Sequence, residues 1–293
     1  MANPRIIVKR RNSVRNIRKI TRTMQLIATA RFQSAYNRAV ATRPYSDKLA
    51  ELVADLSNAG ESIDHPLIRS PQAVTRSAVV VITSSRGLCG GYNANVLRTA
   101  ISHLDESQGR GAAPEVYMVG KKGINYFKFL NRPMVDRVTH IGDTPRFEQI
   151  DPLANLLMER FIADEVQSVE VVYMRFHSVG RQKPEVLALL PISAVSETQP
   201  ERSGPQRRIP YEYSPEPREL LKALLPSTVR MRLFQCFTDA AVSEQTARMV
   251  AMKAATESAG EMITQLTRRY NRARQTQITM ELLDIVGGAN ALG

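Results

Sequence analysis

Apolar residues recur at helical spacing near both ends of the chain. The first such set is spaced by three, four and three residues and consists of Ile17, Ile20, Met24 and Ile27. The second repeats the same spacing and then continues more loosely; it consists of Met252, Ala255, Ala259, Met262, Leu266, Tyr270, Ala273 and Ile278. Alternating steps of three and four are typical of a coiled-coil seam. We therefore expect two terminal helices that pair with each other.

Prolines and glycines set the expected limits of these helices. The first helix is expected to be kinked or interrupted at Pro44 and to stop at residues 58–60. No proline follows Pro226, so the second helix can run from residue 227 to 286, roughly 90 Å at about 1.5 Å per residue. Gly287 and Gly288 are expected to end it. A helix of that length is too long to pack only on one small domain.

The middle of the chain alternates between strand and helix patterns. Residues 77–85 form a continuous apolar, β-branched run, which is typical of a buried strand. Further strands are expected at 115–120, 137–141, 169–177 and 185–192, and helices at 90–104, 121–130 and 151–166. This order predicts a largely parallel, doubly wound sheet that finishes in an antiparallel hairpin. The expected organisation is an N-terminal helix at 1–60, a central α/β domain at 74–210 and a C-terminal helix at 211–293.

The net charge of +12 is concentrated at the N-terminus. Residues 1–46 contain 11 Lys or Arg and no acidic residue, whereas residues 47–226 sum to −1 and residues 227–293 to +2. Such a basic, amphipathic segment fits three interpretations: a mitochondrial transit peptide, a nucleic-acid-binding arm, or a helix that faces acidic protein loops. Charge alone leaves all three open.

The sequence offers little chemistry for catalysis. A glycine-rich turn at 85–91 follows the first strand, where α/β proteins bind phosphate, but its spacing matches neither GxxxxGK[ST] nor GxGxxG. The four histidines are scattered, and Cys89 and Cys236 form no CxxC pair, so two reduced thiols are expected and neither a zinc site nor a disulfide. No run of 18 apolar residues suggests a membrane span. We expect no catalytic residue, cofactor or metal in this chain.

Three segments together resemble the gamma subunit of F-type ATP synthases, over nearly the whole chain. They are RRNSVRNIRKITRTMQLIATAR near the start, SSRGLCGGYNANV in the middle, and SEQTARMVAMKAATESAGEMITQLTRRYNRARQTQITMELLDIVGGA at the end. The resemblance implies an α/β fold in which the N- and C-terminal helices form an antiparallel coiled coil, with a central Rossmann-like domain between them. The signature turn of this family corresponds here to Arg86, Gly87, Leu88, Cys89, Gly90, Gly91 and Asn93.

The resemblance also implies a function. The chain would be the rotary shaft that couples proton flow through a membrane ring of c subunits to ATP synthesis or hydrolysis at sites in a 3:3 ring of alpha and beta subunits, beside epsilon. It would not be an enzyme on its own, and the basic segment would face acidic loops of beta. The motif begins almost at Met1, so we expect no transit peptide and a peripheral place on the cytoplasmic side of a bacterial plasma membrane.

Site residues follow from the same resemblance, position by position. The expected contacts with the surrounding subunits are Met24, Glu244, Arg248, Arg274, Gln275 and Thr279, and the expected contact with the c-ring is Tyr211. Ser85 replaces the usual aspartate of the signature, which puts a hydrogen bond from that carboxylate in doubt. The alternatives are a basic helical nucleic-acid-binding protein, disfavoured by an aromatic content of 6% with no Trp, and a nucleotide-binding α/β enzyme.

Overall fold

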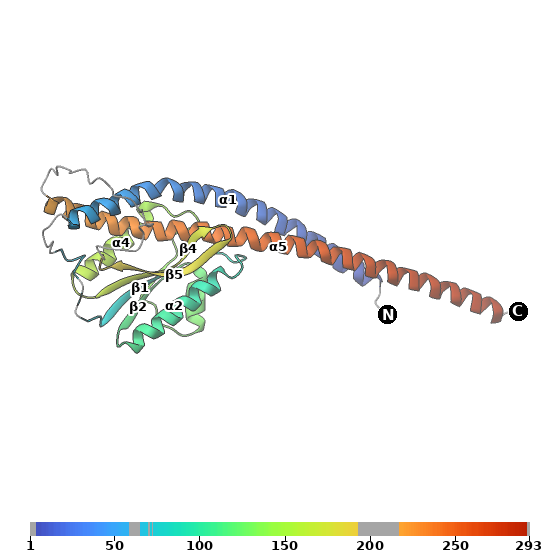
Figure 1. Ribbon diagram of the computed structural model, residues 1–293. Helices are drawn as coiled ribbons and strands as arrows, with labels where there is room; N and C mark the ends of the chain where they lie inside the picture. Colours follow the sequence, from blue (N-terminus) through green and yellow to red (C-terminus); the bar gives the residue numbers. More distant parts are fainter. Residues whose placement is uncertain (1–3, 59–64, 70, 72, 193–216, 292–293) are drawn as a thin grey trace. The chain divides into compact units, whose positions relative to one another are not determined.

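The computed structural model describes residues 4–58, 65–69, 71, 73–192 and 217–291. Within these residues the elements follow one another as α1 (Pro4–Asn58), β1 (Arg76–Ile82), α2 (Tyr92–Gly109), β2 (Ala113–Val119), α3 (Lys121–Phe129), β3 (Asp136–Val138), α4 (Phe147–Ile162), β4 (Ser168–Ser178), β5 (Arg181–Leu190) and α5 (Pro217–Ala291) (Figure 1). Every strand and helix expected from the sequence is present in the expected order.

The chain divides into two compact units, each of which contains part of both long helices. One unit consists of Met1–Ala30 and Arg248–Gly293, and the other of Arg31–Ala247. The second unit, here called the sheet unit, therefore holds more than the 74–210 segment that the sequence assigns to the central domain. The first is here called the helical pair.

The sheet has the strand order β3-β2-β1-β4-β5. The pairs β1–β2, β1–β4 and β2–β3 are parallel, and β4–β5 is antiparallel, which confirms the predicted sheet and its closing hairpin. The chain moves outward from β1 to β3, returns through α4 to β4 on the other side of β1, and so winds in both directions. In the central register Val80 lies between Tyr117 and Val171.

Two hydrophobic cores form because successive side chains of a strand point to opposite faces. Val79 and Val81 of β1 belong to a core that includes buried residues of α2 and α3, such as Val96 and Phe127. Val80 belongs to a second core, which includes buried residues of α4 and the first part of α5. A strand buried on both faces has no polar side to alternate with, and this explains the continuous apolar run at 78–82.

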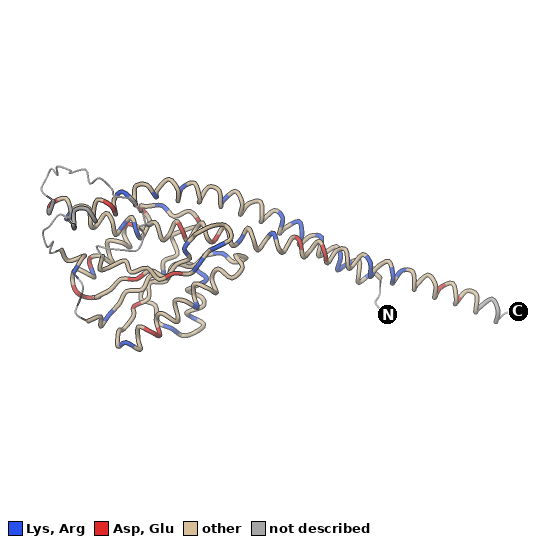
Figure 2. The backbone as a smooth tube through the Cα atoms, viewed as in Figure 1, with Lys and Arg blue, Asp and Glu red and all other residues tan. Residues whose placement is uncertain are grey.

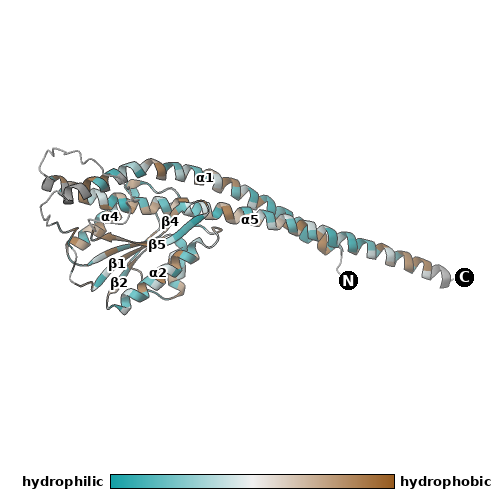
Figure 3. Ribbon diagram, in the orientation of Figure 1, coloured by the Kyte–Doolittle hydropathy of each residue, from teal (hydrophilic) through white to brown (hydrophobic). Residues whose placement is uncertain are grey.

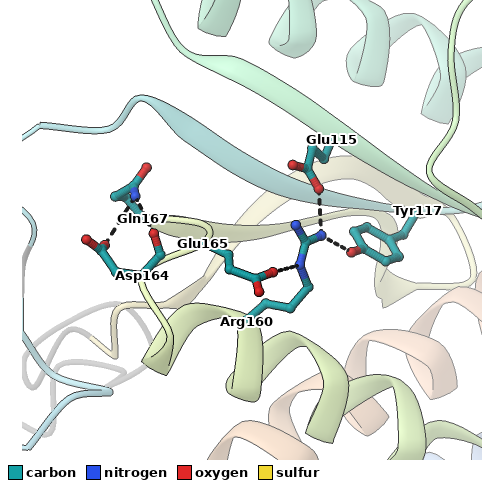
Figure 4. A network of polar contacts seen from close by, with 6 residues as sticks. All are labelled: Glu115, Tyr117, Arg160, Asp164, Glu165 and Gln167. Carbon is teal, nitrogen blue, oxygen red and sulfur yellow. Dashed lines mark hydrogen bonds and ion pairs between the residues drawn. The ribbon is translucent and has the colours of Figure 1, made fainter.

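A network of polar side chains connects α4 to β2 near the amino ends of the strands (Figure 4). Arg160 of α4 donates hydrogen bonds to Glu115 of β2 at 2.6 Å, to Glu165 at 2.8 Å and to the buried Tyr117 hydroxyl. The hydrogen bond to Glu115 is the main reason why the pKa of Arg160 is raised. Nearby, Gln167 donates to Asp164 at 3.1 Å. Arg160 thus joins α4 to β2 and satisfies a phenol that would otherwise be buried without a partner.

Both long helices continue past residues that were expected to interrupt them. α1 contains Pro44 within its helical range. α5 begins at Pro217, ten residues before the start at residue 227 that the prolines suggested and within the 211–293 segment, and it contains Pro226. It also runs through Gly287 to Ala291, so the expected end at Gly287–Gly288 is wrong. A glycine weakens a helix by about 1 kcal/mol but ends it only where the chain adopts a left-handed turn, so its presence alone does not define a helix end.

Gly120 is the glycine on which the sheet unit depends most directly. It follows β2 with φ +92°, and a Cβ atom there would lie 2.2 Å from the carbonyl oxygen of Thr83. Gly120→Ala should therefore lower the free energy of unfolding by about 2–5 kcal/mol, combining left-handed backbone strain with a steric clash. Urea denaturation of the full chain measures the change.

Gly109 provides the matched control for this substitution. It is the last residue of α2, and a Cβ atom there would meet nothing within 4 Å. Gly109→Ala should leave the free energy of unfolding unchanged or raise it by up to about 1 kcal/mol, since alanine favours helix. Equal losses in the two variants would contradict the assigned role of Gly120.

Candidate partner-contact surfaces

The helical pair is antiparallel. Thr256 of α5 donates a hydrogen bond to Thr21 of α1 at 2.9 Å, and the Arg11 guanidinium lies 5.3 Å from the centroid of the Tyr270 ring. Rising residue numbers in α1 therefore meet falling numbers in α5. This arrangement confirms the predicted antiparallel pairing of the terminal helices.

The face of α1 that packs on α5 is not the one predicted from the sequence. Its buried residues recur every seven positions and are Ile7, Val14, Thr21 and Ala28. The predicted seam is largely exposed: Ile17, Ile20 and Ile27 are 51%, 59% and 49% exposed, and Met24 is half-buried. Both stripes have the spacing of a coiled-coil seam and lie side by side on one helix. The helices pair through the stripe of Ile7 and Val14, which form one buried cluster with Leu266 of α5.

The predicted seam of α5 is largely confirmed. Met252, Ala259 and Leu266 are buried, while Ala255, Tyr270 and Ala273 are half-buried. Met262 and Ile278 were wrongly assigned, since they are 42% and 43% exposed. Ile263, one position along, packs against the buried cluster of the pair in place of Met262. Between Ala259 and Leu266, the position that packs on α1 is therefore Ile263, one residue later than predicted.

The unpaired stripe of α1 is a candidate contact surface. We call Ile17, Ile20, Met24 and Ile27 the outer stripe. It is flanked by the basic residues Arg15, Arg18, Lys19 and Arg22, and Lys and Arg recur along this part of α1 without an acidic residue (Figure 2). Large apolar side chains that are left in water at regular helical spacing mark an interaction surface. The basic border favours a partner of negative charge.

The end of α5 carries a second exposed apolar surface (Figure 3). Its residues are more than 40% exposed and are Ile278, Met280, Leu282, Leu283, Ile285 and Val286. Three of the sequence-predicted contacts lie close by: Arg274, Gln275 and Thr279 are all exposed, and the Thr279 hydroxyl donates to the Gln275 carbonyl at 3.0 Å. The structure thus brings these three to one accessible segment of one helix.

The structure buries two other predicted contact residues. Glu244 is 7% exposed and Arg248 is 6% exposed. A side chain that contacts a partner directly must reach the surface, so burial favours a packing role for both in this conformation. Their role as contacts stays a prediction. Tyr211, the predicted c-ring contact, lies outside the described residues.

Burial also perturbs an acidic group on the same helix. Asp239 of α5 is buried and accepts a hydrogen bond from Gln235 at 3.1 Å. Desolvation raises the pKa of Asp239 to about 6, although Arg43 and the Gln235 hydrogen bond oppose the shift. Because the folded-state pKa lies above the usual value, ionisation of Asp239 costs stability as the pH rises through about 6. Nearby Cys236 is buried, and desolvation raises its pKa as well.

The signature turn, residues 84–93, is a closed structure held by its own side chains. Asn93 accepts a hydrogen bond from the Ser84 amide at 3.0 Å and donates to the Ser84 hydroxyl at 2.8 Å and to the Cys89 sulfur at 3.2 Å. The backbone passes through φ 63° at Leu88 and φ 56° at Gly90. A non-glycine residue in this conformation is strained, and the hydrogen bonds around Asn93 compensate for that strain.

The thiol of the signature turn is buried. Cys89 is buried and engaged by Asn93, so it cannot serve as an accessible nucleophile. Gly90 and Gly91 are exposed, Gly87 is half-exposed, and Arg86 and Leu88 project to the surface. Among the described residues no group of three or more His, Cys, Asp or Glu could hold a metal ion. No helix within the described ranges is both long and apolar enough to span a lipid bilayer.

Comparison with known proteins gives consistent matches over the whole chain. The family model described as ATP synthase matches residues 3–292. ATP synthase gamma chains of Rhodopirellula baltica and Leptospira biflexa are each 42% identical over 100% of this chain, and they are covered to 99% and 100% of their own lengths. The gamma chain of Dehalococcoides mccartyi strain BAV1 is 39% identical with full coverage of both.

Solved structures share the fold at low sequence identity. A chain from the Euglena gracilis mitochondrial ATP synthase, in an assembly of OSCP, F1 and c-ring, aligns with a TM-score of 0.66 and 16% identity over 99% of this chain and 94% of its own. A chain from the rotor of the same enzyme aligns with a TM-score of 0.63 and 17% identity over 94% and 98%. At these identities the likeness concerns the fold.

Paired substitutions separate the two stripes of α1. Val14→Ala removes a buried side chain and should lower the free energy of unfolding by about 1–3 kcal/mol. Ile17→Ala removes a larger but exposed side chain and should change it by less than about 0.5 kcal/mol. Thermal unfolding of the full chain, followed by far-UV circular dichroism, measures both. A greater loss for Ile17→Ala would show that the outer stripe, and not the Val14 face, packs on α5.

Proposed function

Because the chain belongs to the family of ATP synthase gamma chains, we propose that it is the central rotary shaft of an F-type ATP synthase. It would couple proton flow through a membrane c-ring to ATP synthesis or hydrolysis at sites formed by alpha and beta subunits. In this role it would carry torque and would have no catalytic activity of its own. It would lie at the cytoplasmic side of a bacterial plasma membrane, attached through the c-ring and beside epsilon.

One observation carries this proposal: the antiparallel helical pair leaves an apolar, basic-bordered stripe unpaired on α1. Ile17 and Ile20 are largely exposed, whereas the pair buries Ile7 and Val14 of α1. Large apolar side chains left in water at regular helical spacing support a further contact surface. A partner with acidic loops would gain long-range attraction from the arginines and short-range contact from the isoleucines.

The expected mechanism is a reciprocal coupling between shaft angle and nucleotide affinity. α1 is strongly basic in its first part and α5 carries few charges of both signs, so the pair presents different faces around its axis. As the shaft turns, each beta subunit would meet a different face and change its affinity for nucleotide. Linkage requires the reverse effect, so ATP hydrolysis could turn the shaft backward.

Individual contacts are assigned to this role by family position. Met24 in the outer stripe would face the acidic beta loops, while Arg274, Gln275 and Thr279 would contact beta near the end of α5. Accessibility of these residues supports the assignment. Glu244 and Arg248 would act from within the chain by supporting the helix that carries those contacts. Tyr211 would meet the c-ring, and the comparisons give no support to the alternative of nucleic-acid binding.

Co-purification tests the proposal most directly. The chain, expressed with an affinity tag in its host, should bring down alpha and beta subunits in a 3:3:1 complex that hydrolyses ATP. Washing at increasing salt should leave the complex intact if apolar contacts contribute, since salt screens only the charged part. Recovery of the folded chain without alpha and beta would contradict the proposed function.

Met24→Lys probes the outer stripe in the assembled enzyme. An added ammonium group facing acidic loops should form an extra ionic contact and reduce ATP-driven proton pumping per ATP hydrolysed by about two- to tenfold, corresponding to roughly 0.4–1.4 kcal/mol. Inverted membrane vesicles report pumping and hydrolysis together. Met24→Leu keeps the apolar volume and should retain the original ratio. Unchanged pumping in Met24→Lys would remove Met24 from the contact surface.

A further inference from the structure

One carboxylate in the sheet unit is shared by two arginines that are far apart in sequence. Asp143 lies in the segment between β3 and α4. Its Oδ2 atom is 2.6 Å from Nη1 of Arg31 in α1 and 3.6 Å from Nη1 of Arg86 in the signature turn. The Asp143 side chain is only 13% exposed, whereas both arginine side chains are more accessible. The carboxylate therefore links α1 to the turn that follows β1.

The Arg86 end of this link is held firmly. Its carbonyl oxygen accepts a hydrogen bond from the Ser84 hydroxyl at 2.5 Å. Ser84 is in turn bound to Asn93, and the Ser84 carbonyl accepts from the Lys122 amide at 3.1 Å. The turn is thus fastened both to itself and to the start of α3. An arginine anchored on such a turn presents its guanidinium from a fixed backbone position.

The Arg31 end lies beside apolar contacts between α1 and the rest of the sheet unit. Phe32 is next in sequence, and its ring centroid is 6.2 Å from that of Phe176 on β4. Tyr36 also packs on Phe176, with centroids 6.0 Å apart. Ala35 and Ala39 complete a buried cluster with Phe176 and Val242. Apolar contacts hold this part of α1 against the sheet, but they are non-directional and do not by themselves define its rotation or axial position.

We propose that Asp143 is a positioning residue that fixes the register of α1 against the signature turn, so that twist in α1 passes to β1 and the sheet. This inference rests on the proposed rotary function and assigns a task to Arg86 of the signature. A short, charge-assisted hydrogen bond is directional and supplies the constraint that the aromatic cluster lacks. Loss of the carboxylate leaves Arg31 and Arg86 as two like charges without the anion between them.

Asp143→Asn tests the inference in the complex purified from its host, because it removes the charge and keeps the shape. Hydrogen exchange at α1 amides near residues 31–36 should become about two- to fivefold faster, the change expected when a partly exposed ion pair is removed. The ratio of proton pumping to ATP hydrolysis in inverted vesicles should fall by about twofold or more. Arg31→Gln should have the same effects, and the double variant should be no worse than either single variant.

Asp105→Asn is the matched control. Asp105 pairs with Arg132 at 2.8 Å elsewhere on the sheet unit, so this change also removes one surface ion pair. Exchange near residues 31–36 and the pumping ratio should both stay at wild-type values. If Asp143→Asn behaves like Asp105→Asn, or if its effect adds to that of Arg31→Gln, the link is wrong. Faster exchange with an unchanged pumping ratio would reduce Asp143 to a structural ion pair and would overturn the positioning role.

The outcome is separable from that of the proposed function. If the wild-type chain fails to associate with alpha and beta subunits, the rotary function fails, and hydrogen exchange on the chain alone still shows whether Asp143 holds α1. If the wild-type complex assembles and pumps while Asp143→Asn matches its control, only the positioning role fails.

Discussion

Close packing of α1 on α5 is the interaction on which the helical pair depends, and its buried cluster contains Ile7, Val14 and Leu266. Thr21 and Ala259 are buried as well, and the Thr21–Thr256 hydrogen bond requires the two helices to approach closely. Large residues at these positions would hold the axes apart. Only one face of α1 packs on α5, so the isoleucines of the outer stripe remain largely exposed on the neighbouring face. The pair thus leaves an apolar surface that is open to a partner.

In the sheet unit, one segment of α5 is buried although many of its residues are polar. Ser243 and Thr246 are fully buried, and each hydroxyl finds a carbonyl partner: Met174 of β4 for Ser243 and Val242 of the helix itself for Thr246. A buried hydroxyl without such a partner would cost about 1–3 kcal/mol. Because these hydroxyls are hydrogen-bonded, this segment of α5 can be buried without a continuous apolar face. Its sequence is therefore more polar than its burial alone would suggest.

The strands and the helices between them were predictable because their signal is local. A β-branched run such as 77–82 has few alternatives to a buried strand. The face of α1 was not predictable in the same way. Ile20 and Thr21 belong to adjacent stripes with the same period, and the larger, more apolar residue is the exposed one. Size and hydrophobicity favour the wrong stripe when a helix carries two apolar stripes and only one of them packs within the chain. The sequence pattern detects an apolar stripe without revealing what covers it.

Residues whose role depends on distant neighbours were the hardest to identify. Family position singled out Arg86 and Glu244, but it gave no reason to expect that Arg86 shares a carboxylate with Arg31 or that Glu244 is buried. Asp143 belongs to no motif, and Arg31 lies 112 residues away from it in sequence. Its importance follows only from three-dimensional position, since an aspartate in a loop is by itself an ordinary solvent-exposed residue.

If the chain is the proposed rotary shaft, the outer stripe has to hold it at each position without trapping it. Complete burial of one isoleucine contributes about 1.5–3 kcal/mol, so four apolar residues held permanently in one pocket would lock the shaft. In a ring of three equivalent partners, each apolar interaction that breaks at one subunit forms again at the next, and the net change in free energy over a step is zero. What remains is the barrier between positions. Attraction between basic α1 residues and the proposed acidic loops of a partner would act over roughly 8–10 Å at physiological salt, so it would persist while the apolar surfaces separate and would lower that barrier. A stripe that combines both kinds of interaction can therefore be held at each position without being trapped there.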